Sequence, residues 1–249
     1  MKSKKIDINC DMGESYYDIK VGNDYKIMPF ITSCNIACGF HGGDPKTISN
    51  TIDYALDKNV KIGAHPSFHD IKGFGRKIIK VSNRQLKNQI LYQVSALKGM
   101  VESKGGRLNH IKPHGALYNM ASIDDEIAKT IVKVIKNIDP NLKLYGPSML
   151  RWKNISENIG INYVSEVFSD RNYNDDLTLV NRNNNKAMIT NPKESLRHVE
   201  RMVKEKTVKS IKGNLIPIIA ETICVHGDQP NAIDFAKIIY DSFKIKKLI

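Results

Sequence analysis

Short apolar runs alternate with helical patterns along the whole chain, and this alternation is what most constrains its fold. Seven runs are strand candidates: Lys5–Cys10, Ile31–Cys38, Val60–Ala64, Leu108–Lys112, Leu142–Gly146, Tyr163–Phe168 and Ile223–Val225. Strands that alternate with helices are typical of βα units around a parallel sheet or barrel. We therefore predict an α/β fold, a single TIM-like βα barrel built on these seven strands, with residues 1–249 as one domain.

Helix-start signals follow most of these runs. They lie at Asp44–Pro45, Ser82, Asp124, Asn191–Pro192 and Pro230. Asp, Asn and Ser side chains accept hydrogen bonds from the free backbone N–H groups of a first helical turn, and proline suits the first helical position. By contrast, residues 173–186 are rich in Asn and Asp and have no helical period, so we expect a loop or hairpin there.

The net charge of +12 raises the question of a polyanionic partner. It comes from 38 Lys+Arg against 26 Asp+Glu, mostly lysines spread along the chain. A nucleic-acid-binding surface would instead cluster Lys and Arg on one face with interleaved aromatic residues. No apolar run approaches the ~20 residues of a membrane span, and the basic stretch Met1–Lys5 leads straight into a strand without an apolar signal segment. We expect neither nucleic acid nor membrane as a partner.

The four cysteines show no CxxC pair, and reduced thiols in a cytoplasmic protein account for them most simply. Cys38 and Cys224 each lie shortly before a histidine at a strand end, so a thiol nucleophile is one interpretation. Both also lie in apolar strands, where a buried cysteine behaves as a small hydrophobe, and this is the second interpretation.

Polar residues with catalytic chemistry gather at the C-terminal ends of the strand candidates. In chain order they are Asn9, Asp11, Glu14, Asn35, Cys38, His41, His65, Lys112, His114, Glu166, Asp170, Arg171, His226 and Asp228. Each of the four histidines in this set is followed immediately by Gly or Pro, where a strand should turn into a loop. Because the C-terminal ends of barrel strands converge on one mouth, we expect these residues to form one site.

Asp11 and Glu14 are the candidates for proton transfer. Two carboxylates in one pocket can hold a cation, or one can be kept protonated by its neighbour and act as an acid. Asp7 shares a strand face with Asp11, but it could equally anchor the bottom of the barrel. The four strand-end histidines could bind a metal, although their spacing matches no local metal motif. Histidines that donate hydrogen bonds or carry protons are the alternative, and the metal stays an open question.

Lys112 and His114 form the most specific pair. A lysine at a strand end suits a carboxylate or a developing oxyanion, and the following histidine is a ready general acid or base. Asp170 and Arg171 offer a second anion clamp, unless they form a salt bridge with each other. The segment Gly39–Asp44 is not a phosphate-binding loop, because the Lys-Ser/Thr ending is absent. A surface or packing role is expected for the other histidines, His69, His110 and His198.

Six segments together resemble the LamB/YcsF family. They are Ile6–Glu14, Asn35–His41, Gly63–Ser67, Lys112–Tyr118, Glu166–Arg171 and Cys224–Asp228. The resemblance runs in order from Ile6 to about Phe243, and it implies a βα barrel related to the glycoside hydrolase/deacetylase barrels. It also implies ATP-dependent opening of 5-oxo-L-proline (pyroglutamate) to L-glutamate, with ATP as cosubstrate and subunits B and C of a 5-oxoprolinase as partners. Leu177 stands where the family usually has glycine.

A five-membered lactam that carries a carboxylate needs an anion anchor, an acid–base set and an activated carbonyl. The candidate catalytic residues are Asp11, Glu14, His41, His65, Lys112 and His114. The candidate substrate-binding residues are Asn9, Asn35, Asp170, Arg171, His226 and Asp228. Since no ATP site is recognisable, we expect phosphorylation to occur largely on the partner subunits. Two alternatives stay open: a free-standing metal-dependent amidohydrolase or carbohydrate deacetylase, and a non-catalytic substrate-binding subunit.

Overall fold

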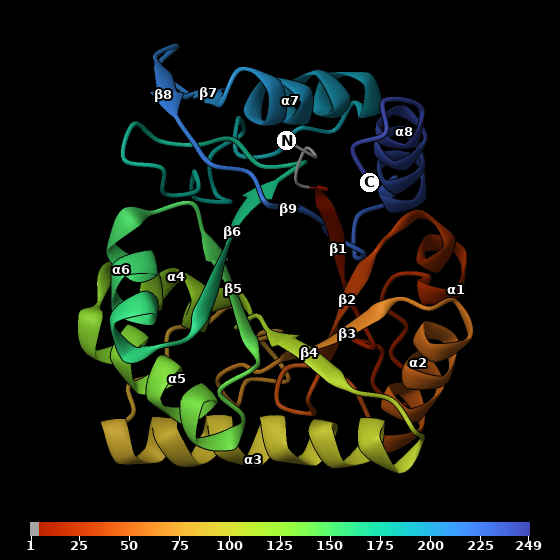
Figure 1. The fold of residues 1–249 in the computed structure, drawn as a ribbon, viewed down its shortest axis with the longest axis vertical. Helices are drawn as coiled ribbons and strands as arrows, with labels where there is room; N and C mark the ends of the chain where they lie inside the picture. Colours follow the sequence, from red (N-terminus) through yellow and green to blue (C-terminus); the bar gives the residue numbers. More distant parts are fainter. Residues whose placement is uncertain (1–4) are drawn as a thin grey trace.

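Seven parallel strands close into a barrel at the centre of the protein, in the order β1-β2-β3-β4-β5-β6-β9 (Figure 1). A computed structural model describes residues 5–249, so residues 1–4 of the expected domain and of the basic stretch Met1–Lys5 lie outside the described residues. The strands are β1 Asp7–Met12, β2 Ser33–Ala37, β3 Lys61–His65, β4 Leu108–Ile111, β5 Lys143–Pro147, β6 Asn162–Phe168 and β9 Thr222–Val225. The predicted α/β barrel with seven strands is confirmed.

Helices surround the barrel (Figure 1). They are α1 Asp24–Ile27, α2 Pro45–Asp57, α3 Asn83–Ser103, α4 Gly115–Ile123, α5 Asp125–Ile138, α6 Leu150–Ile159, α7 Pro192–Lys204 and α8 Ala232–Ile245, with a 3₁₀ turn, η1, at Met28–Phe30. None of the helices within residues 5–249 combines the length and the apolar character needed to cross a membrane.

The expected helix starts are confirmed where a capping side chain marks them. Asp44 accepts from the backbone of the first turn of α2, and Asn191 does the same for α7. At the start of α3, Ser82 and Gln85 form a reciprocal capping box. Helices α1, α4 and α6 were not expected. Helix α1 is a single four-residue turn capped by Asn23, whereas in α4 and α6 the residue before the helix makes no capping side-chain hydrogen bond. Because that signal is missing, no boundary could be recognised from the residues alone.

Barrel closure joins the two ends of the chain. Strand β1 pairs with β2 on one side and with β9 on the other, where Asp7 lies opposite Thr222. The backbone N–H of Ile6 also donates to the carbonyl of Leu248, at 2.7 Å. Between β6 and β9 the chain leaves the barrel for α7 and for a short antiparallel pair, β7 Thr207–Lys209 and β8 Leu215–Pro217. Residues 173–186 form a turn-rich loop, as expected, with a bridge between Tyr173 and Leu179.

The two faces of each strand have different surroundings. In β1, Ile8 and Cys10 belong to the hydrophobic core between the barrel and its helices, whereas Asp11 points toward the mouth of the barrel. At the opposite end, the Asp7 carboxylate accepts hydrogen bonds from the hydroxyls of Ser33 and Thr222, at 2.6 and 2.7 Å. These bonds tie three strands together at the bottom of the barrel, which is the anchoring role considered for Asp7.

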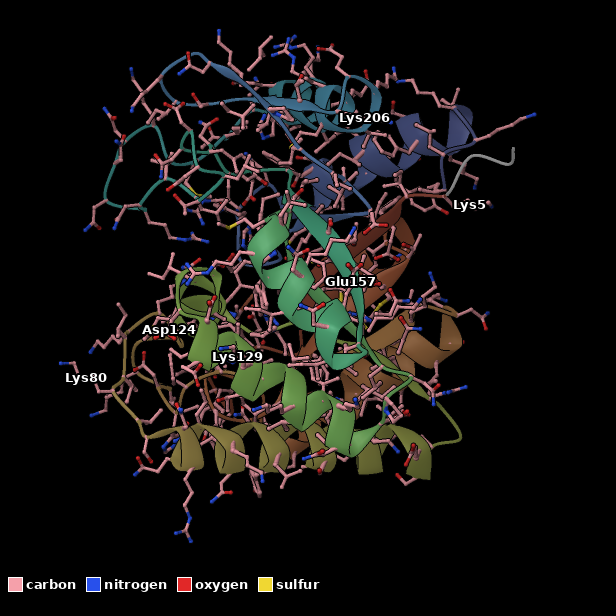
Figure 2. The ribbon with its side chains drawn as sticks, turned by 60° about the vertical axis from the view of Figure 1, so that its left-hand side comes forward. Lys5, Lys80, Asp124, Lys129, Glu157 and Lys206 are labelled. Carbon is pink, nitrogen blue, oxygen red and sulfur yellow. The ribbon has the colours of Figure 1, made fainter. Side chains whose placement is uncertain are left out.

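The positive charge is distributed over the outside of the molecule. Side chains such as Lys5, Lys80, Lys129 and Lys206 come from separate parts of the surface (Figure 2). Several exposed lysines pair with acids on their own helix, as Lys129 does with Glu126 in α5. The net charge of +12 is therefore not concentrated on one binding face.

Candidate active site

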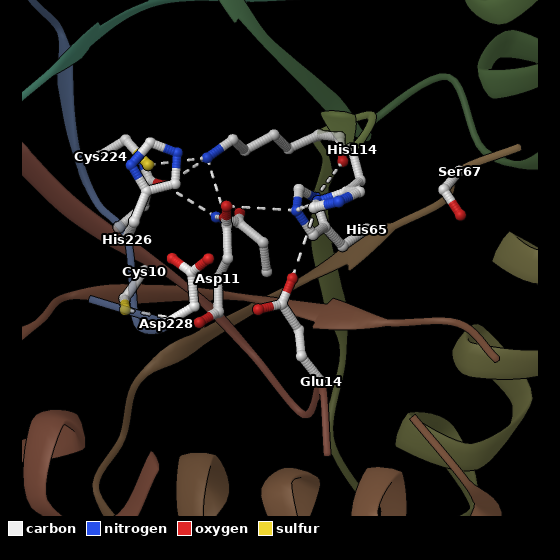
Figure 3. Close-up of polar contacts among 12 residues, drawn as sticks. Cys10, Asp11, Glu14, His65, Ser67, His114, Cys224, His226 and Asp228 are labelled. Carbon is white, nitrogen blue, oxygen red and sulfur yellow. Dashed lines mark hydrogen bonds and ion pairs between the residues drawn. The ribbon is translucent and has the colours of Figure 1, made fainter. Parts of the chain in front are cut away.

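A cavity of about 680 Å³ opens at the C-terminal ends of the barrel strands. Six of the twelve predicted site residues line it: Asp11, His65, Lys112, His114, Arg171 and His226. In the close-up, Asp11 lies between Cys224 and His226 on one side and His65 and His114 on the other (Figure 3). The strand ends thus bring together residues that are far apart in the sequence, as the barrel prediction required.

The Asp11 carboxylate is held as an anion at the centre of this group. It is almost fully buried, and its Oδ1 accepts from the amide of Asn35 at 2.8 Å and from Lys112 Nζ at 2.9 Å. Its Oδ2 lies 3.3 Å from Nε2 of His65. Burial opposes ionisation, but the charges of His65 and Lys112 outweigh it and hold the pKa of Asp11 well below its usual range.

Lys112 lies between two carboxylates. Its Nζ is 2.9 Å from Asp11 Oδ1 and 2.9 Å from Glu166 Oε1, and it lies over the ring of Phe168. Burial disfavours the charged ammonium, yet the neighbouring acid groups raise the pKa of Lys112 well above its usual value. This lysine is therefore a fixed cation whose charge is already balanced by protein groups.

The thiols near the site are protonated. Cys224 Sγ is 2.9 Å from Lys112 Nζ, but burial raises the pKa of Cys224 well above its ordinary value. Burial also raises the pKa of Cys38 to about 12. Because the thiolate is the nucleophile, this arrangement favours the interpretation of both cysteines as small buried side chains.

Hydrogen bonds to fixed acceptors identify the protonation of His65 and His114. Nε2 of His114 donates to the carbonyl oxygen of Phe74, at 2.9 Å. Burial and the charge of His65 lower the pKa of His114 well below its usual value, so the ring is neutral and its Nδ1 is an acceptor. His65 Nε2 lies 3.0 Å from that Nδ1, and His65 Nδ1 lies 2.6 Å from the carbonyl of Lys112. His65 is therefore placed to donate from Nδ1 to this carbonyl and from Nε2 toward His114 and the Asp11 carboxylate.

The same reasoning makes Glu14 a neutral acid. The Ser67 hydroxyl donates to the carbonyl of Phe68, so it accepts from Nδ1 of His41, 3.0 Å away. Burial and the neighbouring histidines lower the pKa of His41 well below its usual value, which leaves its Nε2 as an acceptor. Glu14 Oε1 lies 3.2 Å from this Nε2 and must supply the proton. Burial and the charge of Asp11 accordingly raise the pKa of Glu14 well above its usual value.

Glu14 and His41 are not part of the cavity wall. The rings of His41 and His114 stack in parallel, with centroids 3.8 Å apart and an interplanar angle of 3°. Glu14 and His41 are absent from the cavity lining and lie against His114 and His65. Phe74 packs edge-on against both stacked rings.

Asp170 and His226 form a second pair, on the other side of the mouth. Nδ1 of His226 lies 2.8 Å from the carboxylate of Asp170. Burial acts against ionisation of Asp170, but His226 keeps the pKa of this carboxyl lowered. Arg171 turns away from Asp170 and donates from Nη2 to the carbonyl of Val180, at 2.6 Å. Within residues 5–249 no ion pair joins Arg171 to Asp170, so the salt-bridge alternative is not the one adopted.

Asn9 and Asn35 lie below the cavity, inside the barrel. The amide of Asn35 donates to Asn9 Oδ1 at 2.7 Å, and Asn9 donates to Glu166 at 3.0 Å. Nε2 of His110 donates to the side-chain oxygen of Asn35, and the His110 ring stacks on Tyr145. His110 is fully buried, which agrees with the packing role expected for it. This layer fixes the position of the Asp11 carboxylate.

The remaining histidines lie apart from the cavity. His69 is exposed beside Phe40, and His198 is half-buried with its ring stacked near Tyr173. Both positions agree with the surface or packing roles expected for them.

Asp228 lies at the rim, where its carboxylate pairs with Arg76 at 2.5 Å. Arg76 also lies over the ring of Phe74. The sequence reasoning identified neither Arg76 nor Phe74, because both follow the third strand by about ten residues in an irregular loop. The two glycines on either side of Phe74 were the available signal of a specific loop conformation.

Two sets of donor atoms among the described residues have the composition of a metal site. One is Asp11, Cys224 and His226, whose thiol is protonated, and the other has four members. The ligand atoms of Glu14, His41, His65 and His114 lie within 4.8 Å of one another. However, a metal lies in the plane of each imidazole that binds it, and the stacked rings of His41 and His114 do not share a plane. Their nitrogens also have the hydrogen-bond partners described above. This arrangement fits a hydrogen-bonded chain better than it fits a metal.

Comparisons with known proteins agree with the fold and with the site motifs. The profile of the LamB/YcsF family matches residues 6–248. The chain is 47% identical to a Bacillus mycoides protein named as the A subunit of 5-oxoprolinase, over 241 residues that cover 96% of this chain and 95% of that protein.

Among solved structures, a lactam utilization protein from Thermus thermophilus superposes with a TM-score of 0.91 at 36% identity, covering 98% and 97% of the two chains. A putative cellobiose-phosphate cleavage protein from Enterococcus faecalis superposes with a TM-score of 0.58 at 13% identity, covering 100% and 94% of the two chains, a likeness of fold alone.

Proposed function

The chain belongs to the LamB/YcsF family, and from this premise we propose that it is the A subunit of an ATP-dependent 5-oxoprolinase, which opens 5-oxo-L-proline to L-glutamate. The names of its relatives, a 5-oxoprolinase component and a lactam utilization protein, support this proposal. One observation carries it: a buried carboxylate and a histidine, Asp11 and His65, meet at 3.3 Å in the wall of a cavity. Ring opening of a lactam needs a base for the attacking water and an acid for the leaving nitrogen, and these two side chains can supply them.

The two groups divide the proton transfers between them. A water molecule oriented by Asp11 adds its oxygen to the lactam carbonyl carbon and passes a proton to this carboxylate. The carbon–nitrogen bond then breaks, and the ring nitrogen keeps the electron pair and takes a proton from His65. As His65 loses its charge, the main cause of the low pKa of Asp11 disappears, so the base becomes stronger while the acid acts.

ATP makes the stable amide reactive by converting its oxygen into a leaving group. We assign that phosphorylation to partner subunits B and C, because Gly39–Asp44 lacks the ending of a phosphate-binding loop. We also place the chain in the cytoplasm as one domain of residues 1–249, where its four buried and unpaired cysteines stay reduced.

The test is an assay of 5-oxoproline-dependent ATP hydrolysis and glutamate release, with and without subunits B and C. Asp11→Asn should lower glutamate release by roughly 10²-fold or more, the usual contribution of a positioned base. Asp57→Asn, at an exposed position of α2, is the matched control and should leave turnover unchanged. If Asp11→Asn and His114→Ala both kept full turnover, this chain would be a non-catalytic binding subunit or its site would lie elsewhere.

The cluster of Glu14, His41, His65 and His114 favours one other candidate, a free-standing metal-dependent amidohydrolase or deacetylase. We expect the purified protein to contain no stoichiometric zinc, and the turnover of the assembled complex to survive treatment with a chelator. Zinc at one equivalent, lost together with activity and restored by added metal, would support that candidate instead.

A further inference from the structure

Two arginines that line the cavity, Arg171 and Arg182, form no close ion pair within the described residues. Arg171 is buried, with 6% of its surface exposed, and Arg182 is exposed on the loop that follows it. Both side chains line the cavity, and neither forms an ion pair with a carboxylate of residues 5–249. The Nε of Arg171 is buried without a hydrogen-bond partner among these residues. A buried guanidinium N–H without an acceptor is costly, which indicates a missing anionic ligand.

The charge of Arg182 acts on the guanidinium group of Arg171. Burial lowers the pKa of Arg171 to about 10, and Arg182 is the next contributor. Burial and Arg76 lower the pKa of Arg182 in the same way. The hydrogen bond from Arg171 to the carbonyl of Val180 holds the loop that carries Arg182 against the cavity. Like charges held together by the fold are typical of a site that binds a multiply charged anion.

The inner part of the cavity does not offer such a site. The positive charge of Lys112 is balanced by Asp11 and Glu166, and His65 is balanced by Asp11, so a phosphoryl group there would face two carboxylates. Three arginines line the cavity. Arg76 pairs with Asp228, whereas Arg171 and Arg182 form no close ion pair within the described residues.

The cavity is also larger than the proposed substrate. A volume of about 680 Å³ suits a drug-sized ligand, whereas 5-oxoproline is one five-membered ring with one carboxylate. Space for a second charged group therefore lies next to the Asp11–His65 pair, in the direction of the loop at residues 173–186.

We propose that Arg171 and Arg182 form a phosphoryl subsite, which binds the phosphate carried by the ATP-activated lactam while Asp11 and His65 open the ring. This inference rests on the proposed function. The ligand is a lactam whose carbonyl oxygen has been phosphorylated by transfer from ATP, with ADP released on the partner subunits. Water adds to the ring carbon, the carbon–nitrogen bond breaks with a proton going to nitrogen, and the product is an acyl phosphate. A second water hydrolyses it to the free carboxylate and inorganic phosphate.

The subsite has a specific role in that sequence. Two guanidinium groups can bind several phosphoryl oxygens at once, so they hold the phosphoryl group during ring opening and stabilise the phosphate that leaves when the second water hydrolyses the acyl phosphate. They also position the ring carbon at a fixed distance from the Asp11–His65 pair. Loss of one arginine should therefore impair use of the phosphorylated intermediate rather than binding of 5-oxoproline.

The first experiment measures binding to the purified full-length chain by calorimetry, with inorganic phosphate, ATP and 5-oxoproline as separate probes. Arg182→Gln should weaken phosphate binding by roughly ten-fold or more, which is the usual effect of losing a charged hydrogen-bond donor. It should leave 5-oxoproline binding unchanged. Arg182 is exposed, so its replacement should not disturb folding. Arg197→Gln, at an exposed position of α7, is the matched control and should bind every probe as the unaltered protein does.

The second experiment uses the assembled complex with subunits B and C. In Arg182→Gln and in Arg171→Lys, ATP consumption should continue while glutamate release falls by roughly ten-fold or more, so the ratio of ADP to glutamate should rise. Equal phosphate binding by the Arg182 and Arg197 variants would overturn the subsite. So would loss of 5-oxoproline binding in the Arg182 variant, since the arginines would then hold the substrate carboxylate.

An Arg182-dependent affinity for ATP that exceeds the affinity for phosphate would assign these residues to the nucleotide and overturn the proposal. The proposed function has a separate readout. If the unaltered chain with subunits B and C released no glutamate from 5-oxoproline, that function would fail, whatever the phosphate-binding result.

Discussion

At the scale of single residues, the site depends on where a few protons lie. The main-chain carbonyls of Phe68 and Phe74 can only accept hydrogen bonds, so Ser67 and His114 must donate to them. The donor and acceptor roles of the neighbouring side chains follow from these two bonds. The result is an ionised Asp11 beside a neutral Glu14, two nearby carboxyl groups with opposite protonation. Environments that separate the pKa values of neighbouring acids are a mark of acid–base sites.

This assignment makes a prediction about Glu14. A glutamine amide can donate to Nε2 of His41 as a protonated carboxyl does, so Glu14→Gln should fold and keep glutamate release within about three-fold of the unaltered complex. Glu14→Ala removes the donor and should lower turnover by roughly ten-fold or more. If Glu14 were ionised instead, Glu14→Gln would lower turnover as much as Glu14→Ala.

The pH dependence of stability gives a second readout for the same pair. The folded-state pKa of Glu14 is raised, so the contribution of its neutral form to stability is complete below the ordinary value of 4.5 and is lost as the pH rises toward the folded-state value. Glu14→Gln does not titrate. Denaturant unfolding should therefore show the unaltered protein losing stability relative to Glu14→Gln as the pH is raised above 4.5.

At the scale of elements, backbone packing explains the glycines that follow strand-end histidines. A Cβ atom on Gly42, directly after His41, would lie 2.5 Å from the carbonyl oxygen of Glu14. The loop after β2 can approach the loop after β1 only because this atom is absent. The pattern of a histidine followed by glycine, which marked the site in the sequence, is therefore a consequence of loops that meet closely over the barrel.

Two glycines in neighbouring elements should respond in opposite directions to alanine. In β3, a Cβ on Gly63 would overlap Nε2 of His110, whose hydrogen bond to Asn35 supports Asp11. Gly63→Ala should cost about 1–3 kcal/mol of unfolding free energy and should also lower turnover. In α3, nothing lies within 4 Å of a Cβ on Gly99. Gly99→Ala should therefore add roughly 0.5–1 kcal/mol and leave turnover unchanged. Urea unfolding measures both, and equal effects would contradict the packing argument.

The sequence predicted elements well where a local rule governs them. Buried strands appear as apolar runs, and capping Asp, Ser and Asn residues directly precede helices α2, α3 and α7. Helix α4 has no cap, and its first residue, Gly115, has a φ of +54°, so no local pattern identified it. Leu177 keeps a φ of +65°, a value that glycine adopts freely, so the loop has the conformation that the family's usual glycine implies.

The candidate site was predictable to a similar extent. The rule that barrel strand ends converge identified Asp11, His65, Lys112 and His114 without any structure. It did not separate the residues that line the cavity from Glu14 and His41, which lie one layer behind. That distinction depends on ring stacking between His41 and His114, which are far apart in the chain, and no spacing in the sequence encodes it.

At the scale of the whole molecule, net charge and site charge are independent. The +12 total lies over the outer surface, whereas the inner site pairs Asp11 and Glu166 with Lys112 and His65. A diffuse lysine surface makes few simultaneous phosphate contacts, so its binding to nucleic acid is weak and is lost as salt increases.

This distribution predicts the behaviour toward nucleic acid. In a fluorescence-anisotropy titration with duplex DNA, binding seen at about 50 mM salt should vanish by about 200 mM, with no sequence preference. Turnover of 5-oxoproline should change little over the same range, because Asp11, His65 and Lys112 are buried. Tight binding to one DNA sequence at the higher salt would contradict this view of the surface.

The bond between Ile6 and Leu248 lies at the bottom of the barrel, where β1 begins, opposite the mouth. For a protein engineer this contact is useful, because it brings Ile6 next to Leu248. A short linker could join these two residues there without crossing the cavity, and the chain could be opened in an exposed loop elsewhere on the surface. The arrangement that places Asp11 beside His65 thus does not depend on which strand comes first in the chain. A rearranged chain could carry a fused partner at a chosen position around the mouth.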